Sequence, residues 1–153
     1  MIDINVLSEE GAWSNRLKKK EQFFRDICKA FPKKYRFFNK RISLTLLLSN
    51  NKNIKRLNKN FRNKNKSTDI LSFPFYKKKD LTKTIKNKKQ IYLGDIIINL
   101  DKIKEKNDNT KFQIEFDKLW LHGLLHLFGY KHLRNKDFKK MNNLEKRYFN
   151  YIK

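Results

Sequence analysis

The chain has 153 residues and one cysteine, and its 38 lysines and arginines against 15 aspartates and glutamates give a formal net charge of +23. This length suits one domain over residues 1–153, and the single cysteine excludes a disulfide framework within the chain and suits a reducing cytoplasm. No apolar stretch approaches the roughly 20 residues of a membrane-spanning helix, and the N-terminus lacks the pattern of a secretory signal.

The excess of positive charge favours a polyanionic partner, either nucleic acid or an anionic membrane surface. The joint richness in lysine, asparagine and isoleucine has a second explanation, because an AT-rich genome gives it to many of its proteins. The charge therefore supports RNA as a partner only in combination with a motif that can act on phosphodiesters.

The first part of the chain predicts two strands and two helices. Residues 2–6 alternate apolar and polar side chains, which indicates a strand. An amphipathic helix is expected over 14–30 and is ended by Pro32. A second strand with stronger alternation follows over 42–48, and a short helix over 52–61.

The middle of the chain predicts one loop, one edge strand and a long basic segment. The basic loop 62–66 leads into a strand over 69–75, whose Pro74 cannot donate to a neighbouring strand, so we expect this strand at a sheet edge. Residues 76–90 carry seven lysines and few apolar side chains, and we expect a mobile loop, either a phosphate-contacting arm or a solvated connection.

The last strand is expected over 91–100. Its Gly94 permits a bulge or a close approach of two backbones, and Asp95 is a candidate acceptor for a histidine ring N–H or a plain structural acceptor. The helix that follows has Thr110 and Gln113 at capping-box spacing at its start. A final helix has the apolar positions Phe138, Met141, Leu144, Tyr148 and Ile152.

The order β-α-β-α-β-β-α-α does not alternate as in a doubly wound parallel fold. We therefore predict the α+β class, with a single mixed sheet of about four strands and helices packed on it. The helix that carries the histidines is expected at the centre of this arrangement.

All three histidines of the chain, His122, His126 and His132, fall within eleven residues. His122 and His126 are four apart, so on a helix they lie one turn above each other on one face. His132 lies beyond Gly129, a residue that readily ends a helix, so the chain can turn back toward the same point. Three converging imidazoles leave a fourth position for water, as in a catalytic zinc site, and the clustering disfavours three unrelated histidines.

The spacing His-x3-His-x2-Gly-x2-His is also that of the metzincin peptidases. In those enzymes a glutamate follows the first histidine and acts as general base. Gly123 holds that position here, so the motif predicts a metal that activates water and argues against ordinary peptide hydrolysis. A zinc-dependent peptidase-like hydrolase stays open as an alternative.

At these residues the chain resembles the YbeY family, bacterial metal-dependent endoribonucleases that act in ribosomal RNA maturation. The family motif His-Gly-x-Leu-His-Leu-x-Gly-Tyr-Asp-His is matched at every fixed position except one, where Lys131 replaces the aspartate. Residues 67–75 and 93–96 also resemble family segments, and Arg62 falls where the family has an arginine implicated in activity. Lys131 either adds repulsion toward the ion or contacts an RNA phosphate.

The resemblance implies a single-strand-specific, metal-dependent endoribonuclease that acts in ribosomal RNA processing, including 3′-end maturation of small-subunit rRNA, and in ribosome quality control. One Zn²⁺ ion is expected on His122, His126 and His132, with Arg62 stabilising the charge of the transition state. The expected partners are ribosomal RNA and its precursors and, by inference from the family, ribosomal proteins or the small ribosomal subunit, in the cytoplasm and without a membrane. A non-catalytic RNA-binding assembly factor with a structural metal is the other alternative, and the oligomeric state is left open.

Overall fold

The computed structural model describes residues 2–9 and 40–152, so the helix predicted over 14–30 lies outside the described residues. The strands are β1 (Ile2–Ser8), β2 (Arg41–Ser49), β3 (Ile70–Pro74) and β4 (Gln90–Asn99). They form one sheet in the order β1-β2-β4-β3, in which β1, β2 and β4 are parallel and β3 runs antiparallel to β4. The predicted mixed sheet and α+β class are confirmed.

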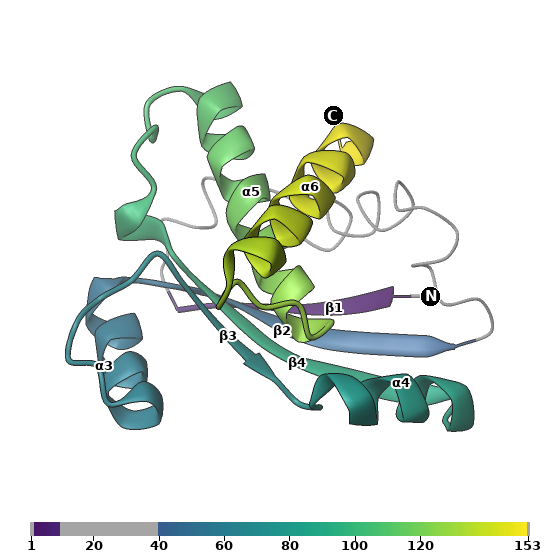
Figure 1. Cartoon of the computed structure of the whole chain (residues 1–153). Coiled ribbons are helices and arrows are strands. Elements are labelled where there is room, and N and C mark those ends of the chain that lie inside the picture. The colour runs from purple at the N-terminus through teal and green to yellow at the C-terminus, as the bar shows by residue number, and fades with distance from the viewer. Residues whose placement is uncertain (1, 10–39, 153) are drawn as a thin grey trace.

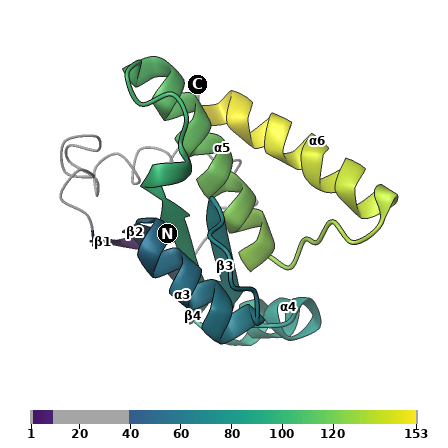
Figure 2. The same cartoon turned by 90° about the vertical axis from the view of Figure 1, so that its left-hand side faces the viewer.

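Helices lie on both faces of this sheet (Figure 1). They are α3 (Asn51–Arg62), α4 (Lys78–Asn87), α5 (Asn109–Leu127) and α6 (Asn135–Ile152), with a short 3₁₀ turn η2 (Leu100–Lys102) after β4. The helices α5 and α6 cover one face, and α3 lies on the opposite face, as the view turned by 90° also shows (Figure 2). None of the helices in the described ranges is long and apolar enough to cross a membrane.

The strand β3 lies at an edge of the sheet, as its proline predicts. Its neighbour β4 contains a bulge, because Leu93 and Gly94 together oppose the single residue Leu44 of β2. Gly94 has φ +131°, and a Cβ there would collide with the carbonyl oxygen of Phe73. The predicted role of this glycine is confirmed, since only glycine lets β3 approach β4 so closely.

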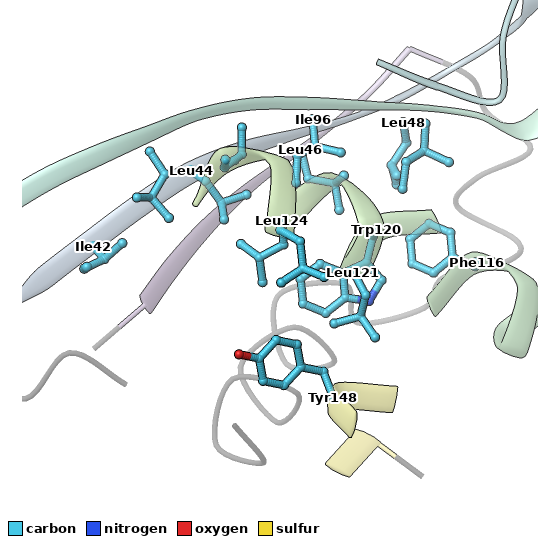
Figure 3. Close-up of a cluster of buried hydrophobic side chains, with 14 of the residues drawn as sticks. Ile42, Leu44, Leu46, Leu48, Ile96, Phe116, Trp120, Leu121, Leu124 and Tyr148 are labelled. Carbon is cyan, nitrogen blue, oxygen red and sulfur yellow. The ribbon is translucent and has the colours of Figure 1, made fainter. Parts of the chain in front are cut away.

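The main core fills the space between the sheet and α5. Figure 3 shows aliphatic side chains of the sheet facing one side of α5, with Tyr148 of α6 beyond it. The largest fully buried side chains of this layer are Trp120 and Phe116 of α5 and Ile42, Leu44, Leu46, Leu48, Leu93, Ile96 and Ile98 of the sheet. A smaller cluster of Ile54, Leu71 and Ile97 lies under α3. The two clusters together fix α5 and α3 on opposite faces of the sheet.

The loop predicted over residues 76–90 is wrong, because most of this segment is the helix α4. Leu81 is 4% exposed and joins the main core, and the half-buried Ile85 packs against the same cluster. These two residues are four apart and so lie on one helix face. This pair of apolar residues at helical spacing is present in the sequence, but the seven lysines of residues 76–90 favoured a loop instead.

Two local predictions about the last helices are also corrected. The helix α5 begins after Asp108, whose carboxylate accepts from the N–H groups of Thr110 and Lys111, instead of through the predicted capping box. The side chain of Gln113 donates to Asp117. In α6, Met141 and Tyr148 are buried as expected, but Phe138 is 58% exposed and does not join the core.

Candidate metal centre

Gly123 sets how closely α5 approaches the sheet. A Cβ at this position would lie 2.8 Å from Cγ2 of Ile96 and 2.9 Å from Cδ1 of Ile70. The residue therefore faces β3 and β4 and not the histidines, so a glutamate here would have no room and no path to them. The position that carries the general base in metzincin peptidases therefore serves packing here. This agrees with the argument from the motif that Gly123 speaks against ordinary peptide hydrolysis.

The end of α5 turns the chain back toward the helix, as expected at Gly129. This glycine has φ +86°, a left-handed conformation that ends helices without a Cβ penalty. Its N–H donates to the carbonyl of His126 at 2.9 Å, and the next N–H, of Tyr130, donates to the carbonyl of Leu125 at 3.1 Å. The turn returns His132 to the two histidines of α5.

The three imidazoles converge on one point. Their candidate ligand nitrogens all lie within 4.8 Å of one another, and the Nε2 atoms of His122 and His126 are 3.0 Å apart. The ring centroid of His132 lies 5.5 Å from that of His122 and 5.1 Å from that of His126. His122 and His126 are half-buried, while His132 is exposed. The predicted cluster is therefore present.

Hydrogen bonds on the outer nitrogens fix which nitrogen of each α5 histidine faces inward. The Nδ1 of His126 lies 2.9 Å from the carbonyl oxygen of Tyr130, which can only accept, so this Nδ1 carries the proton. The Nδ1 of His122 lies 2.5 Å from Oε1 of Glu145 and donates to its carboxylate. Both Nε2 atoms then present lone pairs to each other at 3.0 Å, an arrangement that a cation between them would relieve.

This donor set fits a metal ion. Imidazole nitrogens bound to tetrahedral zinc at about 2.0–2.1 Å lie roughly 3.3 Å apart, close to the separation between these two Nε2 atoms. A third imidazole comes from the turn, and all three histidines line one pocket. The three-histidine cluster is consistent with a metal site that has three protein ligands.

The environment also keeps His126 neutral. Burial, together with the positive charges of His122, His132 and Arg62, lowers the pKa of His126 to about 4, although the hydrogen bond to Tyr130 opposes this change. Metal ligation needs the unprotonated imidazole. Near pH 7 this ligand is therefore ready without first losing a proton.

The histidines line one side of a pocket of about 410 Å³. Arg62 and Ser72 line it as well, together with Lys131, which is exposed. The structure thus brings Arg62, predicted as a functional residue, to the pocket that holds the three histidines.

Arg62 reaches this pocket from the last residue of α3. Its Nη2 donates to the carbonyl of Ser72 at 2.7 Å, and its guanidinium carbon lies 5.5 Å from the ring centroid of Phe73. Asn63 takes the left-handed conformation that ends α3, and the amide of Asn58 holds the following loop through the carbonyl of Lys66 at 2.8 Å. The arginine is therefore held against the edge strand β3.

One residue at this site was missed by reasoning from the sequence. Of the two roles that the sequence left open for Asp95, the structure shows the plain structural acceptor, because Asp95 accepts from the hydroxyl of Tyr92. The partner of His122 is Glu145 of α6. A signal for Glu145 did exist, since this carboxylate lies between Met141 and Tyr148 on the apolar face of the last helix.

Comparison with known proteins agrees with this geometry. A family model described as "Endoribonuclease YbeY" matches residues 7–153. The Endoribonuclease YbeY of Pelagibacter ubique (strain HTCC1062) is 51% identical over 155 residues, which cover 100% of this chain and 97% of the relative. That of Ehrlichia canis (strain Jake) is 33% identical over 147 residues, which cover 95% of this chain and 88% of the relative.

A solved structure agrees as well. The solution structure of TM1509 from Thermotoga maritima superposes with a TM-score of 0.57 at 26% identity, covering 99% of this chain and 89% of that one. A family match over nearly the whole length, a full-length relative at 51% identity and the three-histidine cluster agree with one another. The chain belongs to the YbeY endoribonuclease family.

Proposed function

We propose that this protein cuts single-stranded RNA within the chain, using a metal ion held by His122, His126 and His132. The observation that carries the proposal is the convergence of three imidazoles in a pocket that also receives Arg62. Membership of an endoribonuclease family supports RNA as the substrate, and the net charge of +23 suits a polyanion.

The metal we propose is a single Zn²⁺ ion. Three imidazole ligands in an open pocket are the donor set and geometry of catalytic zinc sites. When bound, such an ion supplies a Lewis acid for a phosphate oxygen and lowers the pKa of water toward about 7. The chain's own contribution is to hold His122 and His126 with their Nε2 atoms inward, through Glu145 and the carbonyl of Tyr130.

Arg62 is the residue we propose to contact the scissile phosphate. A guanidinium has five N–H donors in a planar fork that matches phosphate oxygens, and the bond to Ser72 uses one of them. Holding the fork against β3 orients it before the substrate arrives. Its positive charge would then stabilise the additional negative charge that develops on the phosphate during cleavage.

The helix α4 offers a basic surface beside the pocket. Its first turn packs on the metal-binding turn, because a Cβ on Gly129 would lie 2.8 Å from Cβ of Lys78. The amine of Lys78 also lies 5.1 Å from the ring centroid of Tyr130. The face opposite Leu81 and Ile85 carries the exposed residues Lys79, Lys83 and Lys86, here named the α4 lysine face. We propose that the α4 lysine face binds phosphates of the RNA strand that leaves the pocket.

The biological role we propose follows the resemblance to the family. The substrates are ribosomal RNA precursors, the process includes 3′-end maturation of small-subunit rRNA and ribosome quality control, and the site of action is the cytoplasm. Ribosomal proteins or the small ribosomal subunit would be partners, and residues 1–153 would form one domain.

The test is cleavage of an end-labelled RNA fragment that spans the 3′ end of small-subunit rRNA and its precursor extension. Zinc-loaded protein is expected to cut it, while chelator-treated protein and His126→Ala are expected not to. If zinc-loaded protein binds the RNA but never cuts it, the assembly-factor alternative is favoured and the proposal fails. If His126→Ala folds, binds RNA normally and does not cut, the assembly-factor alternative fails instead.

The ends of the products report the chemical route. Attack by the RNA's own 2′-hydroxyl would leave a 2′,3′-cyclic phosphate. Attack by water would leave a 3′-hydroxyl and a 5′-phosphate without a cyclic intermediate. Finding only the second pair of ends would exclude the 2′-hydroxyl as the nucleophile.

A further inference from the structure

His122 and His126, the two proposed metal ligands on α5, each donate a hydrogen bond from Nδ1, and their acceptors differ. His126 donates from Nδ1 to the carbonyl of Tyr130, which belongs to the same turn. His122 donates from Nδ1 to Glu145, which is 23 residues later in the chain and lies on α6. One ligand is thus held by local backbone, and the other depends on the packing of a second helix.

Glu145 lies on the apolar face of α6, at a position where the helical spacing of the buried residues predicts an apolar side chain. Met141, four residues earlier, is 2% exposed, and Tyr148, three residues later, is 3% exposed. Residues at these spacings share one face of a helix, so Glu145 is in the middle of the face that packs inward. Its side chain is 29% exposed and that of His122 is 30% exposed, so the pair is largely shielded from water.

A carboxylate in this position can do two things for the metal site. As an acceptor it holds the proton of His122 on Nδ1 and turns Nε2 toward the point where the three imidazoles meet. As an anion it also raises the basicity of that imidazole, which strengthens its bond to a cation. The carbonyl that holds His126 is neutral and supplies the first effect without the charge.

We propose that Glu145 is a positioning residue, which sets the tautomer and orientation of His122 and thereby makes metal affinity depend on the docking of α6 against α5. This inference rests on the proposed metal site and does not need RNA to be the substrate. Glu145 is not among the residues that line the pocket of the three histidines, so in this proposal it acts through His122.

The test compares the wild-type full-length protein with Glu145→Gln, Glu145→Ala and the control Glu105→Gln. Glu105 is an exposed carboxylate just before α5, at the opposite end of that helix from the histidines, so its change removes the same charge far from the site. Zinc affinity is measured by competition with a chromophoric chelator. We expect Glu145→Gln to bind zinc about 10-fold more weakly and Glu145→Ala up to about 100-fold more weakly, with Glu105→Gln within about twofold of wild type.

A second readout separates positioning from a general loss of stability. The ¹⁵N resonances of the ring nitrogens report the tautomer of His122 in metal-free protein. We expect the Nδ1-protonated form in wild type and in Glu145→Gln, whose amide oxygen still accepts, and loss of that preference in Glu145→Ala. A residue that only holds the two helices together would not produce this pattern.

Two results would overturn the proposal. One is zinc affinity of Glu145→Gln within about twofold of wild type, and the other is an unchanged His122 tautomer in Glu145→Ala. Should Glu145→Ala not fold, Glu145→Gln decides the matter, since it keeps the side-chain size and an acceptor oxygen. Neither measurement uses RNA cleavage, so wild-type protein that binds zinc and does not cut RNA would defeat the proposed function and leave this inference standing.

Discussion

At the scale of single residues, Gly123 shows how packing and chemistry compete for one position. A Cβ there would lie under 3.0 Å from side-chain atoms of both Ile96 and Ile70. Gly123→Ala gains about 1 kcal/mol of helix propensity but forces a packed layer apart, which costs about 1–3 kcal/mol. We therefore expect a net loss of up to about 2 kcal/mol in the free energy of unfolding, measured by urea denaturation.

The matched control for this change is Lys111→Ala, an exposed position in the first turn of the same helix. It is expected to stay within about 0.5 kcal/mol of wild type. A Gly123→Ala protein as stable as wild type would mean that the two isoleucines move aside without cost. The close approach of α5 to the sheet would then have another cause.

The residues of the site differ in how far the sequence predicts them. His122, His126 and His132 could be predicted because their spacing and the glycine between them are local features. Glu145 could not be assigned to His122, because their contact depends on how α6 docks against α5, and the sequence carries no distance between helices. The sequence left Asp95 open between a histidine partner and a plain structural acceptor, and the structure shows the second, with Tyr92 as the donor.

At the scale of elements, the helix α4 is where the prediction from the sequence was wrong and where a functional test is available. We expect the triple change of Lys79, Lys83 and Lys86 to glutamine to weaken binding of single-stranded RNA. Each lysine that no longer neutralises a phosphate reduces the slope of log affinity against log salt by about 0.7, so the slope should fall by up to about 2. The measurement is fluorescence anisotropy of a labelled RNA at several salt concentrations, with the three-histidine site unchanged.

The control is the triple change of Lys102, Lys104 and Lys111 to glutamine. These exposed lysines lie on η2, on the loop that follows it and in the first turn of α5, and Lys111 is roughly 20 Å along the helix from His126 at 1.5 Å per residue. The control removes the same charge as the α4 triple. If the α4 lysine face is a binding surface, the control should change the slope of log affinity against log salt by much less than the α4 triple does. Equal decreases in both triples would show that only the net charge of the chain matters.

At the scale of the whole molecule, the class of fold follows from the sequence more readily than its arrangement. The alternation in β2 and the proline in β3 predict a strand and an edge, because both are properties of one segment. The strand order β1-β2-β4-β3 depends on contacts between segments far apart in the chain. The loop predicted in place of α4 failed for a related reason, since the two apolar residues that stabilise that helix do so only by joining the main core.

Two titratable groups on α5, the buried Asp117 and the half-buried His126, make the stability of the metal-free protein depend on pH in opposite directions. Burial raises the pKa of Asp117 to about 6, against hydrogen bonds from Gln113 and Trp120. The folded state then binds more protons than the unfolded state between about pH 4 and 6, so this group's contribution is lost as the pH rises through that window. Burial lowers the pKa of His126 to about 4, so its contribution is lost as the pH falls from about 6.5. The two effects largely cancel in wild-type protein.

Asp117→Asn separates the two effects. Asparagine keeps the size and the acceptor oxygen for Gln113, but it removes the charge that is buried at 6% exposure. Because a shift of about two pH units corresponds to about 3 kcal/mol, the variant should be more stable than wild type by up to about that amount at pH 7.5 and equal to it near pH 4. Urea unfolding of the metal-free proteins at pH 4, 5.5 and 7.5 gives the difference directly, since every other titrating group is shared. A variant less stable than wild type at pH 7.5 would mean that Asp117 is held as a carboxylate by its neighbours, and that α5 tolerates a buried negative charge on the face that it packs inward.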